Sequence, residues 1–168
     1  AAMALATVGS DGRPAVRIVL YKGMYEGAFT FYTNYESRKG QELAAQPQAA
    51  ATFWWDRLER QVRIEGLVRR VPAALSDRYF HARPRGSQLA AYTSQQTRPI
   101  ADRAVLEARV ADTAQRYADG EIPCPSWWGG YALEPQSVEF WQGANNRLHD
   151  RLRYRRTDGG WQLERLQP

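Results

Sequence analysis

The chain has 168 residues, of which 43% are hydrophobic, 12% aromatic and 24% charged. This balance excludes a disordered chain, a collagen-like repeat and a coiled coil, and the length suits one domain with a sizeable core. No apolar run approaches a membrane helix, and the one cysteine, Cys124, excludes an internal disulfide framework and a thiolate zinc site. We therefore expect a single domain over residues 1–168, without signal peptide or membrane partner, in a reducing cytoplasm.

The charge is 23 Lys+Arg against 18 Asp+Glu, a net charge of +5. Arginine dominates, because Lys22 and Lys39 are the only lysines. Guanidinium groups bind phosphates and carboxylates through a fork of donors and stack on flat rings. A solvated basic surface is the default interpretation of most of these arginines, and a partner that carries phosphate is the sharper one. Composition does not separate nucleic acid from a small phosphorylated ligand.

The first half of the chain is predicted to form strands. Their apolar and β-branched runs cover Ala4–Val8, Val16–Tyr21, Phe29–Thr33, Ala49–Trp55 and Gln61–Val71. Turns rich in glycine separate the first three. Residues 34–46 change character, and we expect a short helix there, capped by Ser37 and ended by Pro47.

The middle of the chain is predicted to be helical and its end to return to strands. The helices are Ala73–Ala82, which begins after Pro72, and Pro99–Ala118, which stops before Gly120. The strands are Tyr131–Leu133, Ser137–Trp141, and a hairpin of Leu152–Arg156 and Trp161–Leu166 around Asp158-Gly159-Gly160. Strands without regular β-α-β alternation indicate an α+β fold, mainly antiparallel, built as a barrel or sandwich with inserted helices. Because Ala1 and Ala2 run straight into the first strand, we expect that an N-terminal extension is missing.

Two groups of cations in the first half are candidates for anion binding. Arg17 and Lys22 are an odd number of residues apart, so in a strand they point to opposite faces and one strand serves two anions. Arg38 and Lys39 stand at the predicted start of a helix, where backbone N–H groups and the helix dipole favour negative charge. For both groups the alternative is a set of ordinary solvated cations.

A third candidate lies around the first predicted helix of the middle region. Tyr79 and Arg83 are four residues apart and share a helix face, and Ser87 follows Pro84, where we expect the chain to turn. A phenol, a guanidinium and a hydroxyl together make a cradle for one phosphate. His81 points elsewhere, and we expect it to pack or face water.

A fourth candidate follows Trp141. Alternation in an extended segment puts Arg147, His149 and Arg151 on one side and Leu148 and Asp150 on the other. Three basic groups on one edge repel one another unless an anion or a flat ring lies against them. The alternative is an exposed basic strand, because further arginines follow.

The chain lacks the motifs of self-sufficient catalysis. It has no phosphate-binding glycine loop, no dinucleotide fingerprint, and no serine-histidine-acid spacing, and its two histidines and one cysteine predict no metal centre. An organic cofactor would therefore have to carry the difficult chemical step.

Taken together, eight motifs resemble the pyridoxamine 5′-phosphate oxidase family from Leu5 to Pro168. They are Arg17-Ile-Val-Leu-Tyr-Lys22, Tyr32-Thr-Asn34, Ser37-Arg-Lys39, Leu58-Glu-Arg-Gln-Val62, Tyr79-Phe-His-Ala-Arg-Pro-Arg85, Pro125-Ser-Trp-Trp-Gly-Gly130, Val138-Glu-Phe-Trp-Gln-Gly143 and Arg147-Leu-His-Asp-Arg151. One such motif is weak evidence, and the whole set in order is strong. The resemblance implies an FMN-binding split β-barrel that forms a homodimer with each flavin held between subunits.

The resemblance also assigns residues and chemistry. It implies FMN contacts at Arg17, Ile18, Val19, Leu20, Tyr21, Lys22, Tyr32, Thr33, Arg38, Lys39, Gln61, Gln96, Thr97, Trp141 and Arg151. It implies substrate contacts at Lys22, Tyr79, Arg83, Ser87, Arg147, Leu148 and His149, of which Arg147 and His149 are the catalytic candidates. The implied reaction moves a hydride from C4′ of pyridoxamine or pyridoxine 5′-phosphate to flavin N5, gives pyridoxal 5′-phosphate for vitamin B6 synthesis, and ends with reoxidation by O2 to H2O2.

Two departures and two rivals accompany this interpretation. The family's N-terminal segment, which helps cover the substrate, is absent here, and Thr97 stands where serine is commoner. One rival is a related flavin oxidase of the phenazine-biosynthesis type. Its aromatic acid carries no phosphate and would leave unused the phosphate cradle of Lys22, Tyr79, Arg83 and Ser87. The other is a basic module that stacks RNA bases on tryptophans. Because its alternation of aromatic and basic residues on one face is not evident, we expect no nucleic-acid partner.

Overall fold

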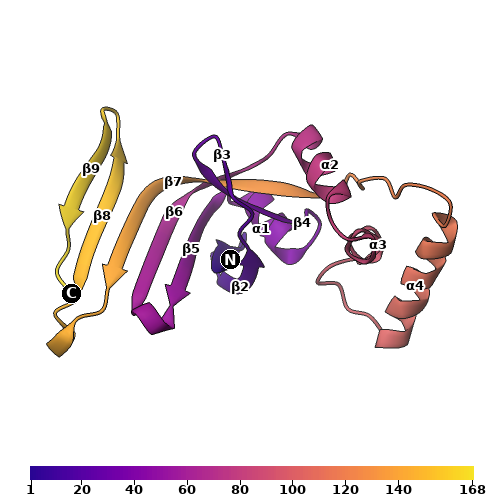
Figure 1. Ribbon diagram of the computed structural model, residues 1–168, viewed down its shortest axis with the longest axis horizontal. Coiled ribbons are helices and arrows are strands. Elements are labelled where there is room, and N and C mark those ends of the chain that lie inside the picture. The colour runs from indigo at the N-terminus through magenta and orange to yellow at the C-terminus, as the bar shows by residue number, and fades with distance from the viewer. The chain divides into compact units, whose positions relative to one another are not determined.

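The computed structural model describes all 168 residues and contains one nine-stranded sheet (Figure 1). The elements in chain order are β1 (Ala2–Val8), β2 (Pro14–Leu20), β3 (Met24–Tyr25), β4 (Ala28–Asn34), α1 (Arg38–Ala45), β5 (Gln48–Trp55), β6 (Arg60–Arg70), α2 (Ala73–His81), α3 (Arg85–Thr93), α4 (Arg103–Arg116), β7 (Trp128–Gln142), β8 (Asp150–Thr157) and β9 (Gly160–Arg165). Single 3-10 turns cover Asp56–Leu58 and Asn145–Arg147.

The strand order is β2-β1-β5-β6-β7-β4-β3, and β8 joins β7 to β9. The pairs β1–β2, β1–β5, β3–β4, β5–β6, β7–β8 and β8–β9 are antiparallel. The predicted α+β class, mainly antiparallel and with inserted helices, is therefore confirmed. No helix is long and apolar enough to cross a bilayer.

The chain divides into two compact units. Unit 1 comprises Ala1–Phe31, Glu42–Arg69 and Ala132–Pro168. Unit 2 comprises Tyr32–Gln41 and Arg70–Tyr131, and so contains α2, α3 and α4. The expectation that the chain folds as one domain stays a prediction.

The core of unit 1 follows the two-residue period of its strands. On β1, Met3, Leu5 and Thr7 are buried, while their neighbours are partly exposed. On β2 the period is the same, but the outward residues are apolar: Val16 is 70% exposed and Ile18 67%. Alternation along an amphipathic strand is what buries one face and leaves the other open.

The core of unit 2 forms around three buried side chains, Phe80, Ile122 and Trp128. Tyr32 and Tyr79 pack against this cluster together with residues of α3. Helix α3 also contacts both α2 and α4. The cluster therefore fixes the start of β7, which carries Trp128, against the end of α2.

Capping residues set the start of two predicted helices. Helix α1 begins at Arg38, directly after the predicted cap: Ser37 Oγ accepts from the Gly40 N–H at 3.3 Å. Helix α4 begins at Arg103 rather than Pro99, because the Asp102 side chain accepts from the Val105 N–H at 2.9 Å. In both cases the capping residue sets the boundary.

The structure contains two elements that were not predicted from the sequence, and one strand that was predicted as two. Helix α3 replaces the turn expected at Ser87, because Pro84 precedes a new helix and the Ser87 N–H bonds to the Pro84 carbonyl at 2.8 Å. The two-residue strand β3 occupies the expected turn between Gly23 and Gly27. Strand β7 continues through Pro135, where two strands were expected.

Candidate functional site

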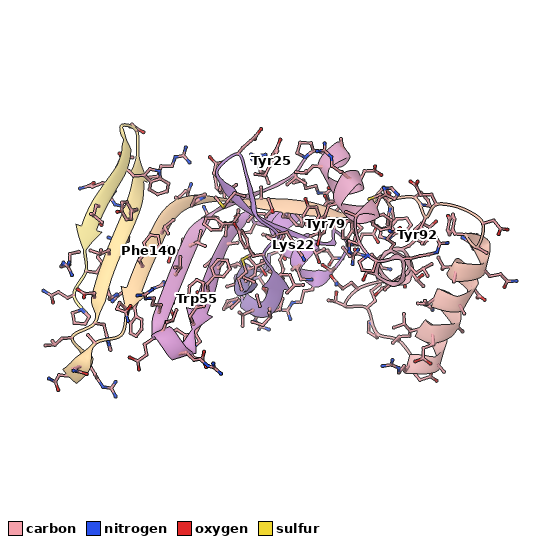
Figure 2. The ribbon with its side chains drawn as sticks, in the orientation of Figure 1. Lys22, Tyr25, Trp55, Tyr79, Tyr92 and Phe140 are labelled. Atoms are coloured by element: carbon pink, nitrogen blue, oxygen red, sulfur yellow. The ribbon has the colours of Figure 1, made fainter.

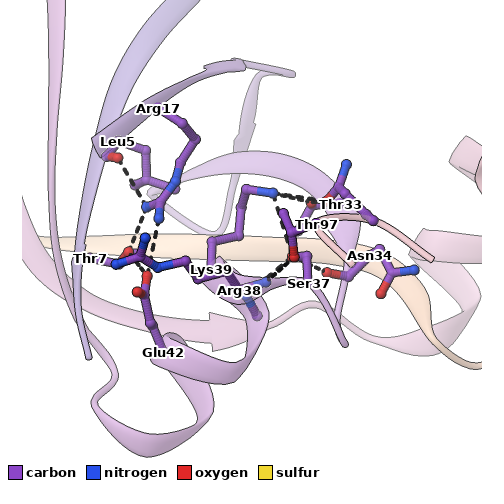
Figure 3. Close-up of polar contacts among 12 residues, drawn as sticks. Leu5, Thr7, Arg17, Thr33, Asn34, Ser37, Arg38, Lys39, Glu42 and Thr97 are labelled. Carbon is purple, nitrogen blue, oxygen red and sulfur yellow. Dashed lines mark hydrogen bonds and ion pairs between the residues drawn. The ribbon is translucent and has the colours of Figure 1, made fainter. Parts of the chain in front are cut away.

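Lys39 is the centre of a polar cluster in unit 2 (Figure 3). Its side chain is buried, and Nζ donates to Gln96 Oε1 at 2.8 Å and to Thr33 Oγ1 at 3.1 Å. Thr33 Oγ1 in turn donates to Gln96 Oε1 at 2.8 Å. Helix α1 supplies the lysine, β4 the threonine, and the segment after α3 the glutamine, so three distant parts of the sequence meet at one ammonium group.

The start of α1 is hydrogen-bonded to the segment after α3, which also carries Gln96. The Arg38 N–H donates to Thr97 Oγ1 at 2.8 Å, and Thr97 has a φ of +71°. A β-branched residue rarely adopts this left-handed conformation, and strained residues of this kind cluster at ligand sites. The backbone N–H groups at the start of α1 were expected to be free to bind an anion. This expectation is wrong for Arg38 and Gly40, whose N–H groups already have partners. The side chains of Arg38 and Lys39, rather than the helix dipole alone, supply the positive charge.

Arg17 belongs to a second polar cluster, within unit 1 (Figure 3). Its Nη2 lies 3.0 Å from Glu42 Oε2, and its Nη1 donates to Thr7 Oγ1 and, at 3.2 Å, to the Leu5 carbonyl. The Glu42 side chain is only 8% exposed. The guanidinium therefore balances a buried carboxylate, a structural task that the sequence analysis did not foresee.

The rest of the β2 motif lies along an edge strand. Ile18 and Leu20 are exposed, Val19 is half-buried, and Tyr21 packs edge-on against Phe53 at 5.5 Å between ring centroids. Lys22 lies beyond the end of β2 and is exposed, and its N–H donates to the Thr30 carbonyl (Figure 2).

The ring of Tyr32, next to Thr33 on β4, lies on the opposite face of the strand, because adjacent strand residues point to opposite faces. Tyr32 stacks on Tyr79 at 4.0 Å and on Trp128 at 5.7 Å between ring centroids. Gly130 leaves room for this stack, because a Cβ there would lie 2.7 Å from Tyr32 Cε1. The Tyr79 side chain is labelled in Figure 2.

Arg83 completes this aromatic cluster. Its Cζ lies 4.7 Å from the centre of the Trp128 ring. Its Nη1 is buried and has no hydrogen-bond partner. Burial lowers the pKa of Arg83, although a guanidinium remains charged at neutral pH. A buried charged donor without a partner is costly, so this atom is the strongest candidate among the basic side chains for binding an anion.

Arg83 and Tyr79 meet around Trp128 and not on one helix face. Helix α2 ends at His81, so Arg83 lies beyond it. Ser87, in the first turn of α3, is half-buried. Trp128 stands in a quoted motif without a predicted role, and its contacts with Tyr32, Tyr79 and Arg83, which are distant from it in the sequence, reveal one.

A second aromatic group forms in unit 1 at the ends of β7 and β8. Trp141 pairs with Arg151 across the two strands, and the Trp141 and His149 rings lie 4.6 Å apart. Trp54 stands 6.0 Å from Trp141 and pairs with Gln61 across β5 and β6. The predicted residues Gln61, Trp141, His149 and Arg151 are therefore neighbours, and Trp54 joins them.

The extended arrangement predicted for residues 147–151 is wrong. Asn146 and Arg147 have φ values of 55° and 61° within a 3-10 turn, and β8 begins only at Asp150. Alternation therefore does not set the directions of Arg147 and His149. Leu148 is 69% exposed. Two successive left-handed residues other than glycine cost about 1–3 kcal/mol each, and such strain is typical of binding segments.

His149 accepts a hydrogen bond at one ring nitrogen. The Ala144 N–H donates to His149 Nδ1 at 3.2 Å. A nitrogen that accepts carries no proton, so the neutral ring holds its proton at Nε2.

Arg151 is held by a buried carboxylate that the sequence analysis missed. Glu139 accepts from Arg151 Nε at 2.8 Å and Nη2 at 3.1 Å, and Arg63 lies 3.4 Å away. The hydrogen bond from Arg151 lowers the pKa of Glu139. The alternation of residues along a strand does not show which glutamate will contact an arginine of the neighbouring strand, so this pair could not be predicted from the sequence.

Comparison with known proteins gives consistent matches. A family model described as pyridoxamine 5′-phosphate oxidase matches residues 1–117, and one described as the pyridoxine 5′-phosphate oxidase C-terminal dimerisation region matches residues 128–168. The pyridoxine/pyridoxamine 5′-phosphate oxidases of Pseudomonas paraeruginosa and Cyanothece sp. are 59% and 58% identical to the chain, over 99% of this chain and 78% of each relative.

Two solved structures are also similar. PhzG from Burkholderia lata, in complex with tetrahydrophenazine-1-carboxylic acid, superposes with a TM-score of 0.93 at 32% identity, over 99% of this chain and 82% of that one. A pyridoxamine 5′-phosphate oxidase-related, FMN-binding protein from Nostoc punctiforme superposes with a TM-score of 0.80 at 21% identity, over 99% and 88%. The second likeness concerns the fold alone.

Proposed function

The chain belongs to the pyridoxamine 5′-phosphate oxidase family, and on that premise we propose that it oxidises pyridoxamine or pyridoxine 5′-phosphate to pyridoxal 5′-phosphate. The family consists of FMN-dependent oxidases with the split-barrel fold. The observation that carries the choice of a phosphorylated substrate is the buried Nη1 of Arg83, which has no partner.

The donors around Lys39 fit the phosphate of FMN. The Lys39 ammonium, the Thr97 hydroxyl and the exposed Arg38 guanidinium are donors that favour a dianion, and the Thr33 hydroxyl becomes a donor to the phosphate when it turns away from Gln96 Oε1. Bound FMN would supply a hydride acceptor that O2 can reoxidise, with O2 reduced to H2O2. We propose that Thr33, Arg38, Lys39, Gln96 and Thr97 hold its phosphate.

The remaining flavin contacts are proposed from the family resemblance. They are Arg17, Ile18, Val19, Leu20, Tyr21, Lys22, Tyr32, Gln61, Trp141 and Arg151. Arg17 and Arg151 each already bind a buried carboxylate, so any contact they make with a ligand uses their remaining N–H groups. Their geometry is then set by Glu42 and Glu139, and this rigidity reduces the entropy lost on binding.

We propose that Tyr79, Arg83 and Ser87 of unit 2 bind the substrate phosphate, and the family resemblance adds Lys22. The Arg83 guanidinium lies over the Trp128 ring, and its Nη1 has no hydrogen-bond partner. A dianion there receives a charge-assisted bond in a site shielded from water, where such a bond is strong.

We propose that Arg147, Leu148 and His149 position the reacting ring of the substrate. His149 keeps its proton at Nε2, because the Ala144 N–H occupies Nδ1. The Nε2–H is then a donor toward a substrate oxygen or nitrogen, and the Arg147 guanidinium stabilises negative charge that develops beside it. Neither side chain needs to act as an obligatory base.

The wider setting is also a proposal. The match to a dimerisation region supports a homodimer, and we propose that FMN lies at the subunit interface. The exposed apolar face of β2 is consistent with burial in an assembly. We propose that the protein works in the cytoplasm, in vitamin B6 synthesis or salvage, on small molecules and O2 and without nucleic-acid or membrane partners.

One second candidate is favoured by a specific observation, the TM-score of 0.93 with PhzG. That enzyme was solved with a phenazine carboxylic acid, which has no phosphate. The two functions are distinguished by peroxide production from FMN-loaded protein given pyridoxine 5′-phosphate, unphosphorylated pyridoxine, or a reduced phenazine carboxylic acid. We expect turnover of the phosphorylated vitamin, with unphosphorylated pyridoxine at least 100-fold poorer in kcat/KM, since about 3 kcal/mol of phosphate binding is lost. Preferential turnover of the phenazine acid would show that the second candidate is right.

A further inference from the structure

His81, the last residue of α2, has a hydrogen-bond acceptor at each ring nitrogen. Nδ1 lies 3.0 Å from the Asp77 carbonyl oxygen and Nε2 lies 3.0 Å from the Ile122 carbonyl oxygen. Carbonyl oxygens only accept, whereas a neutral imidazole donates from one nitrogen and presents a lone pair at the other. Both bonds form together only when the ring is the protonated imidazolium.

The charged groups that face His81 favour the same form. Asp77 Oδ1 on α2 lies 3.5 Å from Nδ1, and Glu121 Oε1, on the segment before β7, lies 2.8 Å from Nε2. Burial lowers the pKa of His81, but the Ile122 carbonyl and the carboxylates of Glu121 and Asp77 outweigh it and raise the pKa. Cys124, which follows Ile122 on that segment, stays a neutral thiol, because burial raises its pKa to about 11.

The ring joins the two pieces of chain that build the Arg83 site. Ile122 is fully buried and packs with Phe80 and Trp128. Trp128 carries the Arg83 guanidinium on its face, and Arg83 is two residues beyond His81. Gln88 Nε2 further fixes the intervening turn by donating to the Arg83 carbonyl at 2.8 Å. Loss of the His81–Ile122 bond therefore loosens the support of Trp128 under Arg83.

We propose that His81 is a positioning residue for substrate binding: as an imidazolium it ties the 121–122 segment to α2 and so holds Trp128 against Arg83. This proposal rests on the proposed function, because it takes Arg83 as the group that binds the substrate phosphate. Deprotonation of His81 loses one of the two carbonyl bonds, and the site then binds phosphate more weakly.

The direction of the pH dependence follows from the sign of the shift. A histidine whose pKa is raised on folding contributes fully at a pH below its unfolded-state pKa, about 6.5, and the contribution is lost as the pH rises through the folded value. Replacing His81 therefore has its largest effect at pH 6 and little effect at pH 9.

The first test is a carbon-13 NMR titration of the FMN-loaded protein labelled at histidine. Only two histidines are present, and the His81 resonance is identified by its loss in His81→Gln. We expect a His81 pKa above 6.5, and a lower one in Glu121→Gln, which removes the carboxylate beside Nε2. A His81 pKa at or below 6.5 in the wild-type protein, or one that does not move in Glu121→Gln, overturns the proposal.

The second test compares KM for pyridoxine 5′-phosphate in His81→Gln and wild type at each pH from 6 to 9. Taking the ratio cancels the pH effects that both proteins share, such as the titration of the substrate phosphate. We expect a ratio of about 10 at pH 6, equivalent to ~1.4 kcal/mol, that falls toward 1 at pH 9, with kcat and FMN content nearly unchanged. A ratio that does not vary with pH, or an effect on kcat alone, overturns the positioning role.

The two tests separate this proposal from the proposed function. If the wild-type protein does not oxidise pyridoxine 5′-phosphate, the proposed function fails, and the dissociation constant for inorganic phosphate replaces KM in the same comparison. If His81→Gln does not fold, Glu121→Gln takes its place. The ratio of its KM to the wild-type KM is expected to increase as the pH rises from 6 toward the wild-type His81 pKa. A flat ratio in that variant overturns the proposal as well.

Discussion

Arg83→Met tests the phosphate site with little disturbance of the fold. Methionine keeps an apolar side chain over Trp128 and removes every donor. In the ligand-free protein a buried donor without a partner costs about 1–3 kcal/mol, while a cation–π contact contributes about 0.5–2 kcal/mol. Because these terms oppose each other, we expect the free energy of unfolding to change by less than about 2.5 kcal/mol.

Substrate binding should respond much more strongly than stability. Removing one charge-assisted hydrogen bond from Nη1 costs about 1.5–3 kcal/mol, or about a 10-fold to 150-fold rise in KM for pyridoxine 5′-phosphate. KM is measured by peroxide release, FMN content by absorbance, and stability by urea unfolding. Arg109→Met, at an exposed position on α4, is the matched control for loss of charge. Loss of FMN with an unchanged KM would refute the reasoning, because the two phosphate sites would then be assigned in reverse.

Three further predictions concern other residues. Lys39→Met should weaken FMN binding at least 10-fold in a fluorescence titration, and unchanged affinity would remove Lys39 from the phosphate site. His149→Ala should lower kcat at least 10-fold without releasing FMN, and an unchanged rate would exclude it from the reaction. Glu139→Gln should lower the free energy of unfolding at pH 7 by about 2 kcal/mol, less than for a fully buried pair because Arg151 is 26% exposed. Since the pKa of Glu139 is depressed, this difference should shrink as the pH falls through that value; a constant difference in urea unfolding from pH 7 to pH 3 would contradict it.

Local sequence signals predicted the strands and the last hairpin well. The alternation on β1 and β2 and the turn at Asp158-Gly159 depend only on residues that are close together in the chain. They can therefore be predicted from the sequence. Helix α3 was missed because Pro84 was interpreted as a stop when it instead precedes a new helix. The left-handed turn at Asn146 and Arg147 was missed because no glycine marks it.

The candidate site was predictable as a set of cations but not as a set of contacts. Lys39 at the start of α1 follows from a cap and a helix pattern. The neutralisation of Arg17 by Glu42 and the placing of Arg83 on Trp128 depend on packing between distant segments. Only the three-dimensional structure separates an arginine that balances a carboxylate from one whose buried nitrogen lacks a partner.

The most direct test of the account is an anaerobic absorbance measurement on the FMN-loaded protein. We predict that pyridoxamine 5′-phosphate bleaches the flavin band, that pyridoxal 5′-phosphate forms in equal amount, and that admitted O2 restores the band with release of H2O2. Protein that takes up no FMN, or a flavin band that stays unchanged with both phosphorylated vitamers, would contradict the account.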